Sequence, residues 1–221
     1  MEAANRDGFD VGAHKMNGAG IVAGWISTNN QNRAQTSRIP CAWRGSNAFK
    51  LEQFGCDWGE AADINDAGLV LVLAYRGLSP NAIIWRCEDT ASRNVEGLTD
   101  VIPVSISNSG RVLGNRPLQD GTSVPFFLEN GHCRNIFNEF NGSATGMNER
   151  GDVIGYSPID GKYRPWILME NESFYWLPYL HEHWCRPTSI TEDRVIVGNG
   201  QSDHGSHALL WKMTAGSATS C

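Results

Sequence analysis

A short turn motif that recurs five times constrains the fold of this chain more than any other feature. Its fullest copy is Asp63–Val72, where a four-residue turn from Asn65 to Gly68 separates two apolar runs. Asn favours the start of a tight turn, and Gly supplies the positive φ that the last turn position needs. The motif therefore predicts a β-hairpin with a bulge-type turn. The other copies are Met16–Gly24, Ile106–Gly114, Met147–Gly155 and Ile190–Gly198.

The copies keep a regular spacing along the chain. Their last turn residues stand at positions 20, 68, 110, 151 and 194, which gives intervals of 48, 42, 41 and 43 residues. A short apolar run follows each hairpin and ends at 43, 85, 128, 168 and 211, with steps of 42, 43, 40 and 43. Two markers with one period indicate a repeat of about 42 residues that holds three or four short strands. No stretch shows a sustained helical period. The sequence thus predicts an all-β, five-bladed β-propeller with few or no helices.

The repeat also predicts the domain organisation. We expect one β-propeller domain over residues 1–221, and the segment 1–12 is expected to close the ring by adding an outer strand to the fifth unit. A small residue or Pro stands three positions before the first apolar residue of each hairpin, where it would let backbones approach closely. These residues are Ala13, Ala61, Pro103, Ala144 and Pro187. The repeat units are approximately 13–60, 61–102, 103–143, 144–186 and 187–221.

The fifth turn differs from the others because Arg194 stands where they have Gly. A non-Gly residue with positive φ costs about 1 kcal/mol. If the fifth turn has the shared shape, Arg194→Gly is therefore expected to stabilise the chain.

The repeated residues resemble the HAF repeat, a bacterial repeat often found in extracellular proteins. Its pattern of Ala-x-x-Ile-Asn-x-x-Gly, followed later by an apolar run and Trp, is matched by Ala61 to Gly68, by Ala144 to Gly155 and by Ala208 to Trp211. The resemblance extends from about Ala13 to Lys212. It implies a propeller-like β fold, and it implies no reaction.

Composition limits the possible partners and compartments. The net charge of −6 argues against a nucleic-acid backbone binder. There is no apolar run long enough for a transmembrane helix and no signal-peptide pattern at the first residues, so we expect an extracellular or periplasmic location if a leader was removed, and a cytoplasmic one otherwise. Six cysteines without CxxC spacing are compatible with free thiols or with up to three bridges. No cofactor is expected.

Candidate binding residues emerge where the repeats differ at equivalent positions. The residue six before the first apolar residue of each hairpin lies in a loop between blades, where function is often placed. These positions carry Asp10, Trp58, Asp100, Asn141 and Trp184. The position after the second strand of each hairpin carries another mixed set, including Trp25 and Tyr156. Trp side chains at such positions suit a protein hot spot or a sugar face, although packing onto their own blade is the alternative.

Two loops add further candidates. Asp57 and Glu60 flank Trp58 and, together with Asp63, raise the possibility of a glycoside-processing enzyme. The stretch from His181 through His183 to Cys185 resembles a metal cluster, but a fourth ligand for a structural zinc ion is not evident, so no metal is predicted and His183 is kept as a binding candidate.

The favoured function is a non-catalytic module for protein–protein interaction. Its acidic balance suits a basic protein partner, including a toxin that it would neutralise. The alternative is a carbohydrate-binding, lectin-like propeller, and a glycoside-processing enzyme is less favoured because the acids are not repeated in register. The sequence contains no GxSxG, phosphate-binding Gly-rich loop or HExxH motif. Neither nucleic acid nor membrane is expected as a partner.

Overall fold

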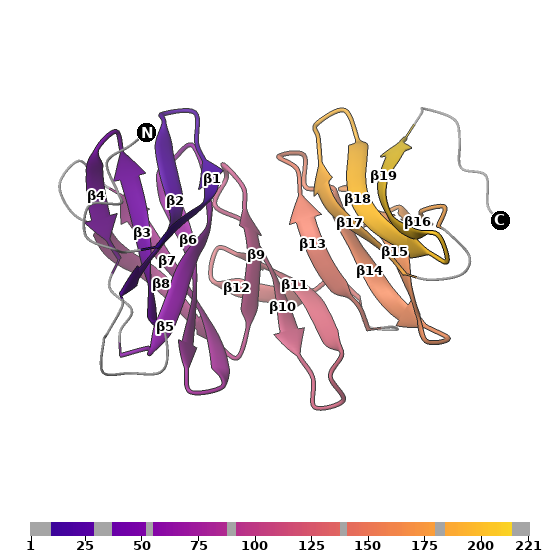
Figure 1. Ribbon diagram of the computed structural model, residues 1–221, viewed down its shortest axis with the longest axis horizontal. Coiled ribbons are helices and arrows are strands. Elements are labelled where there is room, and N and C mark those ends of the chain that lie inside the picture. Colours follow the sequence, from indigo (N-terminus) through magenta and orange to yellow (C-terminus); the bar gives the residue numbers. More distant parts are fainter. Residues whose placement is uncertain are drawn as a thin grey trace. The chain divides into compact units, whose positions relative to one another are not determined.

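The computed structural model describes residues 10–28, 37–51, 55–87, 92–137, 141–179 and 184–213. Within these ranges every regular element is a β-strand, and the strands form five antiparallel sheets (Figure 1). Four sheets have four strands and one has three. The described ranges contain no helix long and apolar enough to cross a membrane. The all-β, five-bladed prediction is confirmed.

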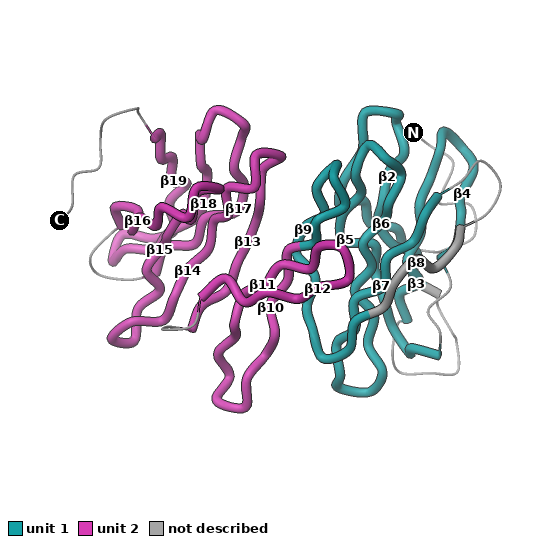
Figure 2. Tube along the Cα trace, turned by 180° about the vertical axis from the view of Figure 1, so that it is seen from behind, with its two compact units in different colours: residues 1–112 teal, residues 113–221 magenta. Residues whose placement is uncertain are grey.

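The backbone packs into two compact units, residues 1–112 and 113–221 (Figure 2). The first unit holds two complete blades, each built from strands in sequence order. Blade one consists of β1 (Val11–Met16), β2 (Ile21–Thr28), β3 (Ser37–Arg44) and β4 (Asn47–Lys50). Blade two consists of β5 (Trp58–Ile64), β6 (Leu69–Arg76), β7 (Ser79–Cys87) and β8 (Ser92–Thr99).

The third blade begins in the first unit with β9, and the division between the units falls at the first residue of β10. The remaining strands of that blade and the last two blades belong to the second unit. Blade three consists of β9 (Ile102–Ile106), β10 (Val112–Pro117), β11 (Ser123–Glu129) and β12 (His132–Asn135). Blade four consists of β13 (Ser143–Met147), β14 (Val153–Ile159), β15 (Lys162–Leu168) and β16 (Phe174–Trp176), and blade five of β17 (Cys185–Ile190), β18 (Val195–Ser202) and β19 (Gly205–Lys212).

All five repeated turns have one hydrogen-bond pattern. The first turn residue accepts from the N–H of the fourth, and its own N–H donates to the carbonyl of the fifth, with N···O distances of 2.9–3.1 Å. The side-chain oxygen of the first residue also accepts from the N–H of the fifth. An amide or hydroxyl oxygen suffices for this bond, which explains why the turn tolerates other residues in place of Asn. The five first residues are Asn17, Asn65, Ser107, Asn148 and Thr191.

Where the first turn residue is Asn, its NH₂ group reaches the next blade. Asn17 donates to the carbonyl of Asn65 at 3.0 Å, and Asn65 donates to the carbonyl of Ser107 at 2.8 Å. In the second unit Asn148 donates to the carbonyl of Thr191 at 3.2 Å. The turn motif therefore shapes its own hairpin and also sets the spacing to the following blade. The second role cannot be read from the local sequence.

In four of the five repeats a β-bulge follows the small residue or Pro that precedes the hairpin. The register of the first strand shifts directly after Ala13, Ala61, Ala144 and Pro187. A bulge bends the strand and increases its twist. These positions thus mark a bulge in addition to the close backbone approach expected from the sequence.

Each unit buries apolar side chains between neighbouring blades. In the first unit, Ile21, Ala23 and Leu51 of blade one belong to the same buried cluster as Val70 and Trp85 of blade two.

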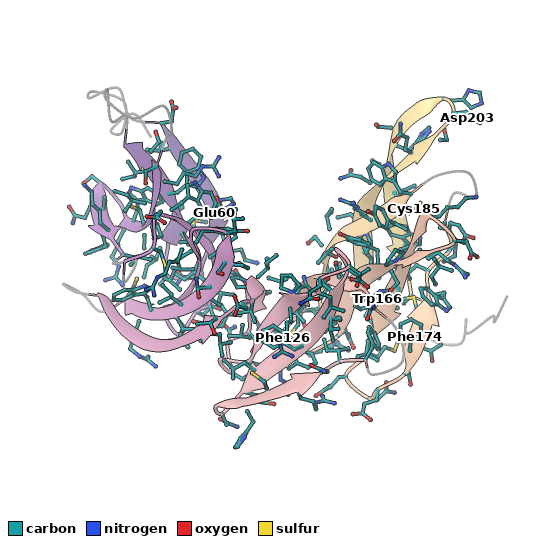
Figure 3. All side chains as sticks on the ribbon, turned by 90° about the horizontal axis from the view of Figure 1, so that it is seen from below. Glu60, Phe126, Trp166, Phe174, Cys185 and Asp203 are labelled. Carbon is teal, nitrogen blue, oxygen red and sulfur yellow. The ribbon has the colours of Figure 1, made fainter. Side chains whose placement is uncertain are left out.

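In the second unit, Ile154 and Ile167 of blade four pack with Ile196 and Trp211 of blade five. Trp166 is fully buried, and its ring lies 6.1 Å from that of Phe174 (Figure 3).

The described part of the N-terminal segment lies in the first blade. Val11 and Gly12 belong to β1, where they pair with Ile26 and Trp25 of the adjacent β2. Residues 1–9 lie outside the described ranges, so the closing of the ring by segment 1–12 stays a prediction.

None of the cysteines that the structure describes is joined in a disulfide. Cys41 and Cys185 are buried. Burial raises the pKa of the Cys41 thiol to about 11, although nearby Lys50 opposes this rise. Such a thiol is protonated at neutral pH and is therefore a poor nucleophile.

Candidate functional site

The most developed candidate site lies between blades one and two, in the first unit. We call it the Arg38 corner, and it consists of Trp25, Arg38, Trp58 and Glu60. Trp25 comes from β2, Arg38 from β3, and Trp58 and Glu60 from β5. The corner thus combines the two middle strands of blade one with the first strand of blade two, and Figure 3 labels its residue Glu60.

The Arg38 guanidinium lies over the rings of both indoles. Its central carbon is 4.0 Å from the ring centroid of Trp25 and 5.4 Å from that of Trp58. Its Nη1 donates to Oε2 of Glu60 at 2.7 Å. His14 Nε2 lies 3.6 Å from the same oxygen. Cation–π contacts and a charge-assisted hydrogen bond therefore fix both the plane and the orientation of the guanidinium.

Each tryptophan also contacts a further residue of its own blade. The indole of Trp25 lies over Gly12, directly across the β1–β2 pair, where any Cβ would overlap the ring. The ring of Trp58 meets that of Tyr75 edge-on, with centroids 5.4 Å apart. Both indoles are therefore positioned before any ligand arrives.

An open pocket of about 370 Å³ lies at this corner, and its lining residues are Asp10, Trp25, Ser27, Arg38 and Trp58. Ser27 is buried and its Oγ accepts from the main-chain N–H of Asp10 at 3.0 Å. The pocket thus offers aromatic faces, a guanidinium and an exposed carboxylate residue within one wall. Such a lining can hold an apolar or aromatic group and satisfy polar groups beside it.

The carboxylates proposed for glycoside chemistry are engaged in structural contacts. Glu60 pairs with Arg38, and the Asp57 carboxylate accepts from the N–H of Gly77 at 3.1 Å. Asp63 is buried and accepts from the hydroxyl of Ser105 and the N–H of Ile106 in the next blade. A retaining or inverting glycosidase needs two carboxyl groups that face the substrate. These three acids have other partners.

A second aromatic corner lies between blades four and five, in the second unit. We call it the Arg186 corner, and it consists of Tyr156, Tyr163, Trp184 and Arg186. The Arg186 guanidinium lies 4.7 Å from the ring of Tyr156, 4.5 Å from that of Tyr163 and 5.5 Å from that of Trp184. The indole N–H of Trp184 donates to Oε1 of Gln201 at 2.8 Å.

The structure therefore distributes the predicted residues over two corners. Trp25 and Trp58 come together with Glu60, and Tyr156 comes together with Trp184. Asp10 joins the pocket of the Arg38 corner. Asp57 lies beside that corner, with its carboxylate on the Gly77 N–H.

Three other predicted residues do not join these clusters. Asp100 is exposed and has a φ of 55°. Asn141 donates through Nδ2 to the hydroxyl of Thr122 at 3.0 Å. His183 lies outside the described residues.

The sequence reasoning missed both arginines that organise the corners. Arg38 is placed by its strand register, because Trp25 pairs with Pro40 in β2–β3 and Arg38 lies two residues earlier on the same face. Arg186 is the last residue of the predicted polar cluster that begins at His181, but it was given no role there. A search for cations near the predicted tryptophans would have found Arg186 but not Arg38, which is distant from both tryptophans in sequence.

Comparisons with known proteins show the fold alone. A comparison with protein-family models found no match, and a comparison with curated proteins found none either. Among solved structures, a puromycin-hydrolyzing peptidase of Mycobacterium tuberculosis is similar over 95% of this chain and 37% of its own, with 13% identity and a TM-score of 0.62. TolB from Acinetobacter baumannii is similar over 88% of this chain and 53% of its own, with 11% identity and a TM-score of 0.58.

A third similarity involves a propeller domain considered by itself. The β-propeller domain of the Trilobed protease from Pyrococcus furiosus is similar over 92% of this chain and 82% of its own, with 8% identity and a TM-score of 0.53. The chain spans about half or less of the peptidase and TolB chains. At these identities the similarity establishes an all-β fold of the propeller class, and the activities of the larger proteins do not follow from it.

Proposed function

We propose that this chain is a non-catalytic binding module for a protein partner and that the Arg38 corner is its anchor site. The observation that carries the proposal is the pair of tryptophans that both contact one guanidinium at an open pocket. Trp and Arg are enriched among the residues that contribute most to protein interfaces. Because packing already fixes these side chains, binding would cost little further side-chain ordering.

The charge of the chain adds a weaker argument about the partner. The net charge of −6 favours approach by a protein with a basic surface, including a basic toxin. Net charge acts at long range and does not define the contacts. The proposal of a basic partner therefore rests on charge alone, whereas the proposal of a protein partner rests on the corner.

A carbohydrate ligand is the second candidate. The pocket places the exposed residue Asp10 beside Trp58 and Arg38, and a sugar can stack on an indole while its hydroxyls bond to charged groups. A glycoside-processing enzyme is less supported, because Glu60 is already paired with Arg38 at 2.7 Å.

Affinity capture with matched variants tests the proposal. Immobilised wild-type chain, Trp58→Ala and the control Leu78→Ala, whose side chain is 97% exposed and outside the pocket, are incubated with lysate of the source organism. Captured proteins are identified by mass spectrometry, and the specific one is purified and titrated. Trp58→Ala is expected to weaken its binding by about 30-fold, the equivalent of a 2 kcal/mol hot spot, while Leu78→Ala leaves it unchanged.

The same variants separate the two candidates on a glycan array. Binding of a defined glycan by wild-type chain and its loss in Trp58→Ala would replace the protein partner with a carbohydrate. A protein partner that binds Trp58→Ala as tightly as wild type would contradict the assignment of the anchor site.

A further inference from the structure

The two corners are built from the same four positions of the repeat, but the arginine stands at a different one of these positions in each corner. Trp58 and Trp184 both lie seven residues before the first residue of their turns, and Glu60 and Arg186 both lie five residues before it. Arg186 therefore occupies the position of Glu60. In both corners the arginine stacks on aromatic rings, but Arg38 comes from the third strand of its blade and Arg186 from the first strand of its blade.

The remaining two positions correspond in the same way. Trp25 and Tyr156 pair with Pro40 and Pro165, respectively. Two residues before each proline stand Arg38 and Tyr163. Tyr163 therefore occupies the position of Arg38. The Arg38 corner contains a cation and a carboxylate, whereas the Arg186 corner contains a cation and no carboxylate at any of the four positions.

Arg186 consequently has no anionic partner among the residues that the structure describes. Its Nε is buried and lacks a hydrogen-bond partner within those ranges. Three rings surround the guanidinium and remove part of its hydration. Aromatic faces attract a cation but cannot accept its in-plane N–H hydrogen bonds as a carboxylate does. Arg38, in contrast, donates to Glu60 at 2.7 Å.

We propose that the Arg186 corner binds a carboxylate of the protein partner, the side chain of an Asp or Glu, which takes the role that Glu60 has in the Arg38 corner. This inference rests on the proposed function. A guanidinium held flat by aromatic rings presents its N–H edge in a fixed direction, and a carboxylate matches that edge with two oxygens. The net charge of −6 disfavours polyanions such as nucleic acid.

NMR of the arginine side chains tests this site directly. The probes are sodium acetate, a blocked pentapeptide with one central Glu, the same peptide with Gln, and sodium glucuronate, all at matched ionic strength. The Nε–Hε resonances of Arg186 and Arg38 are assigned with Arg186→Lys and Arg38→Lys. We expect acetate and the Glu peptide to shift the Arg186 resonance saturably, at least ten times more than the Gln peptide does. The Arg38 resonance, already paired with Glu60, is the internal control and should stay in place.

Two further variants sharpen the test. Glu182→Gln removes the nearest carboxylate in sequence, so the titration is run on this variant and on the wild-type chain. A saturable shift in either one supports the site, and its absence in both would overturn the site. Tyr163→Glu places a carboxylate at the position opposite Arg186 and is expected to lower the affinity for the Glu peptide at least tenfold.

The remaining outcomes are also decisive. Equal shifts of the Arg186 and Arg38 resonances, or equal shifts with the Glu and Gln peptides, would show that no carboxylate site exists. Glucuronate binding at least tenfold tighter than the Glu peptide would assign the corner to an acidic sugar and overturn the protein assignment. The titration tests only the carboxylate site at the Arg186 corner, whereas capture with Trp58→Ala tests the proposed function. Failure of one hypothesis can therefore be distinguished from failure of the other.

Discussion

Replacing Arg194 by Gly separates two opposing effects at the fifth turn. Arg194 has a φ of 59°, and its N–H donates to the carbonyl of Thr191 at 3.0 Å as in the Gly-containing turns. The fifth turn therefore has the same backbone shape as the four turns that contain Gly, and backbone strain considered alone favours Gly at position 194. The side chain, however, donates from Nε to Oδ2 of Asp152 at 2.8 Å and from Nη2 to Oδ1 at 3.2 Å. The sequence-based expectation that Gly stabilises did not include this ion pair.

The expected magnitudes favour the arginine. Removing a positive φ from a non-Gly residue gains about 1 kcal/mol. Removing one partner of a buried ion pair costs about 3–5 kcal/mol, because the other charge remains buried. Asp152 is 0% exposed, and Arg194 is 32% exposed. Asp152 also keeps the N–H of Glu170 and the NH₂ of Asn148, so the lower end of about 3 kcal/mol applies. Arg194→Gly should therefore destabilise the chain by about 2 kcal/mol.

Urea unfolding followed by tryptophan fluorescence measures this free energy, and a second variant isolates its cause. In an Asp152→Asn background the buried charge is absent, so Arg194→Gly should become neutral or stabilising by up to about 1 kcal/mol. The sign of the effect thus reverses between the two backgrounds. If Arg194→Gly stabilises the wild-type chain as much as it stabilises Asp152→Asn, the ion pair contributes nothing and the reasoning is refuted.

Three further predictions concern Gly12, Asn65 and Asp152. Gly12→Ala should displace the Trp25 indole and reduce partner capture at the Arg38 corner; undiminished capture would show that the indole is not needed. In urea unfolding, Asn65→Ala should cost about 2–4 kcal/mol, because the N–H of Leu69 loses its side-chain acceptor and the carbonyl of Ser107 loses one of its two donors, while Asn65→Ser should cost about half as much. Hydrogen bonds from an arginine, an amide and a backbone N–H outweigh burial and lower the pKa of Asp152. The ionised carboxylate therefore stabilises the folded chain at neutral pH, and this contribution is lost as the pH falls through the folded-state pKa. Asp152→Asn should therefore flatten the loss of unfolding free energy below about pH 4.

The fold could be predicted because the repeated turn is encoded locally. Asn65 and Gly68 specify one hairpin by their own conformational preferences, and the constant spacing of the copies gives the number of blades. The role of Asn65 toward the next blade could not be predicted, because its NH₂ group bonds to a carbonyl 42 residues away. The Arg194–Asp152 pair was missed for the same reason, since it also connects positions 42 residues apart.

The candidate site was predicted only in part. Aligning the repeats identified Trp58 and Trp184 as equivalent, and it identified Trp25 and Tyr156 as a second equivalent set. It did not show that a member of one set stands beside a member of the other. That relation depends on how the middle strands of one blade meet the start of the next blade, and the period within a blade carries no information about this.

The exchange between Arg38 and Arg186 indicates what a corner of this fold requires chemically. If a fixed position determined the cation, both corners would carry it on the same strand, but one carries it on β3 and the other on β17. In both cases the guanidinium lies over a ring from the second strand of one blade, Trp25 or Tyr156, and over a ring at the start of the next blade, Trp58 or Trp184. The aromatic pair is therefore the constant part, and the source of the cation is variable. The strand that supplies the cation therefore decides whether the corner has its own carboxylate. In the Arg38 corner the cation comes from β3, and the β5 position carries Glu60. In the Arg186 corner the cation occupies the position of Glu60 and Tyr163 occupies that of Arg38, so the proposed carboxylate comes from outside the chain.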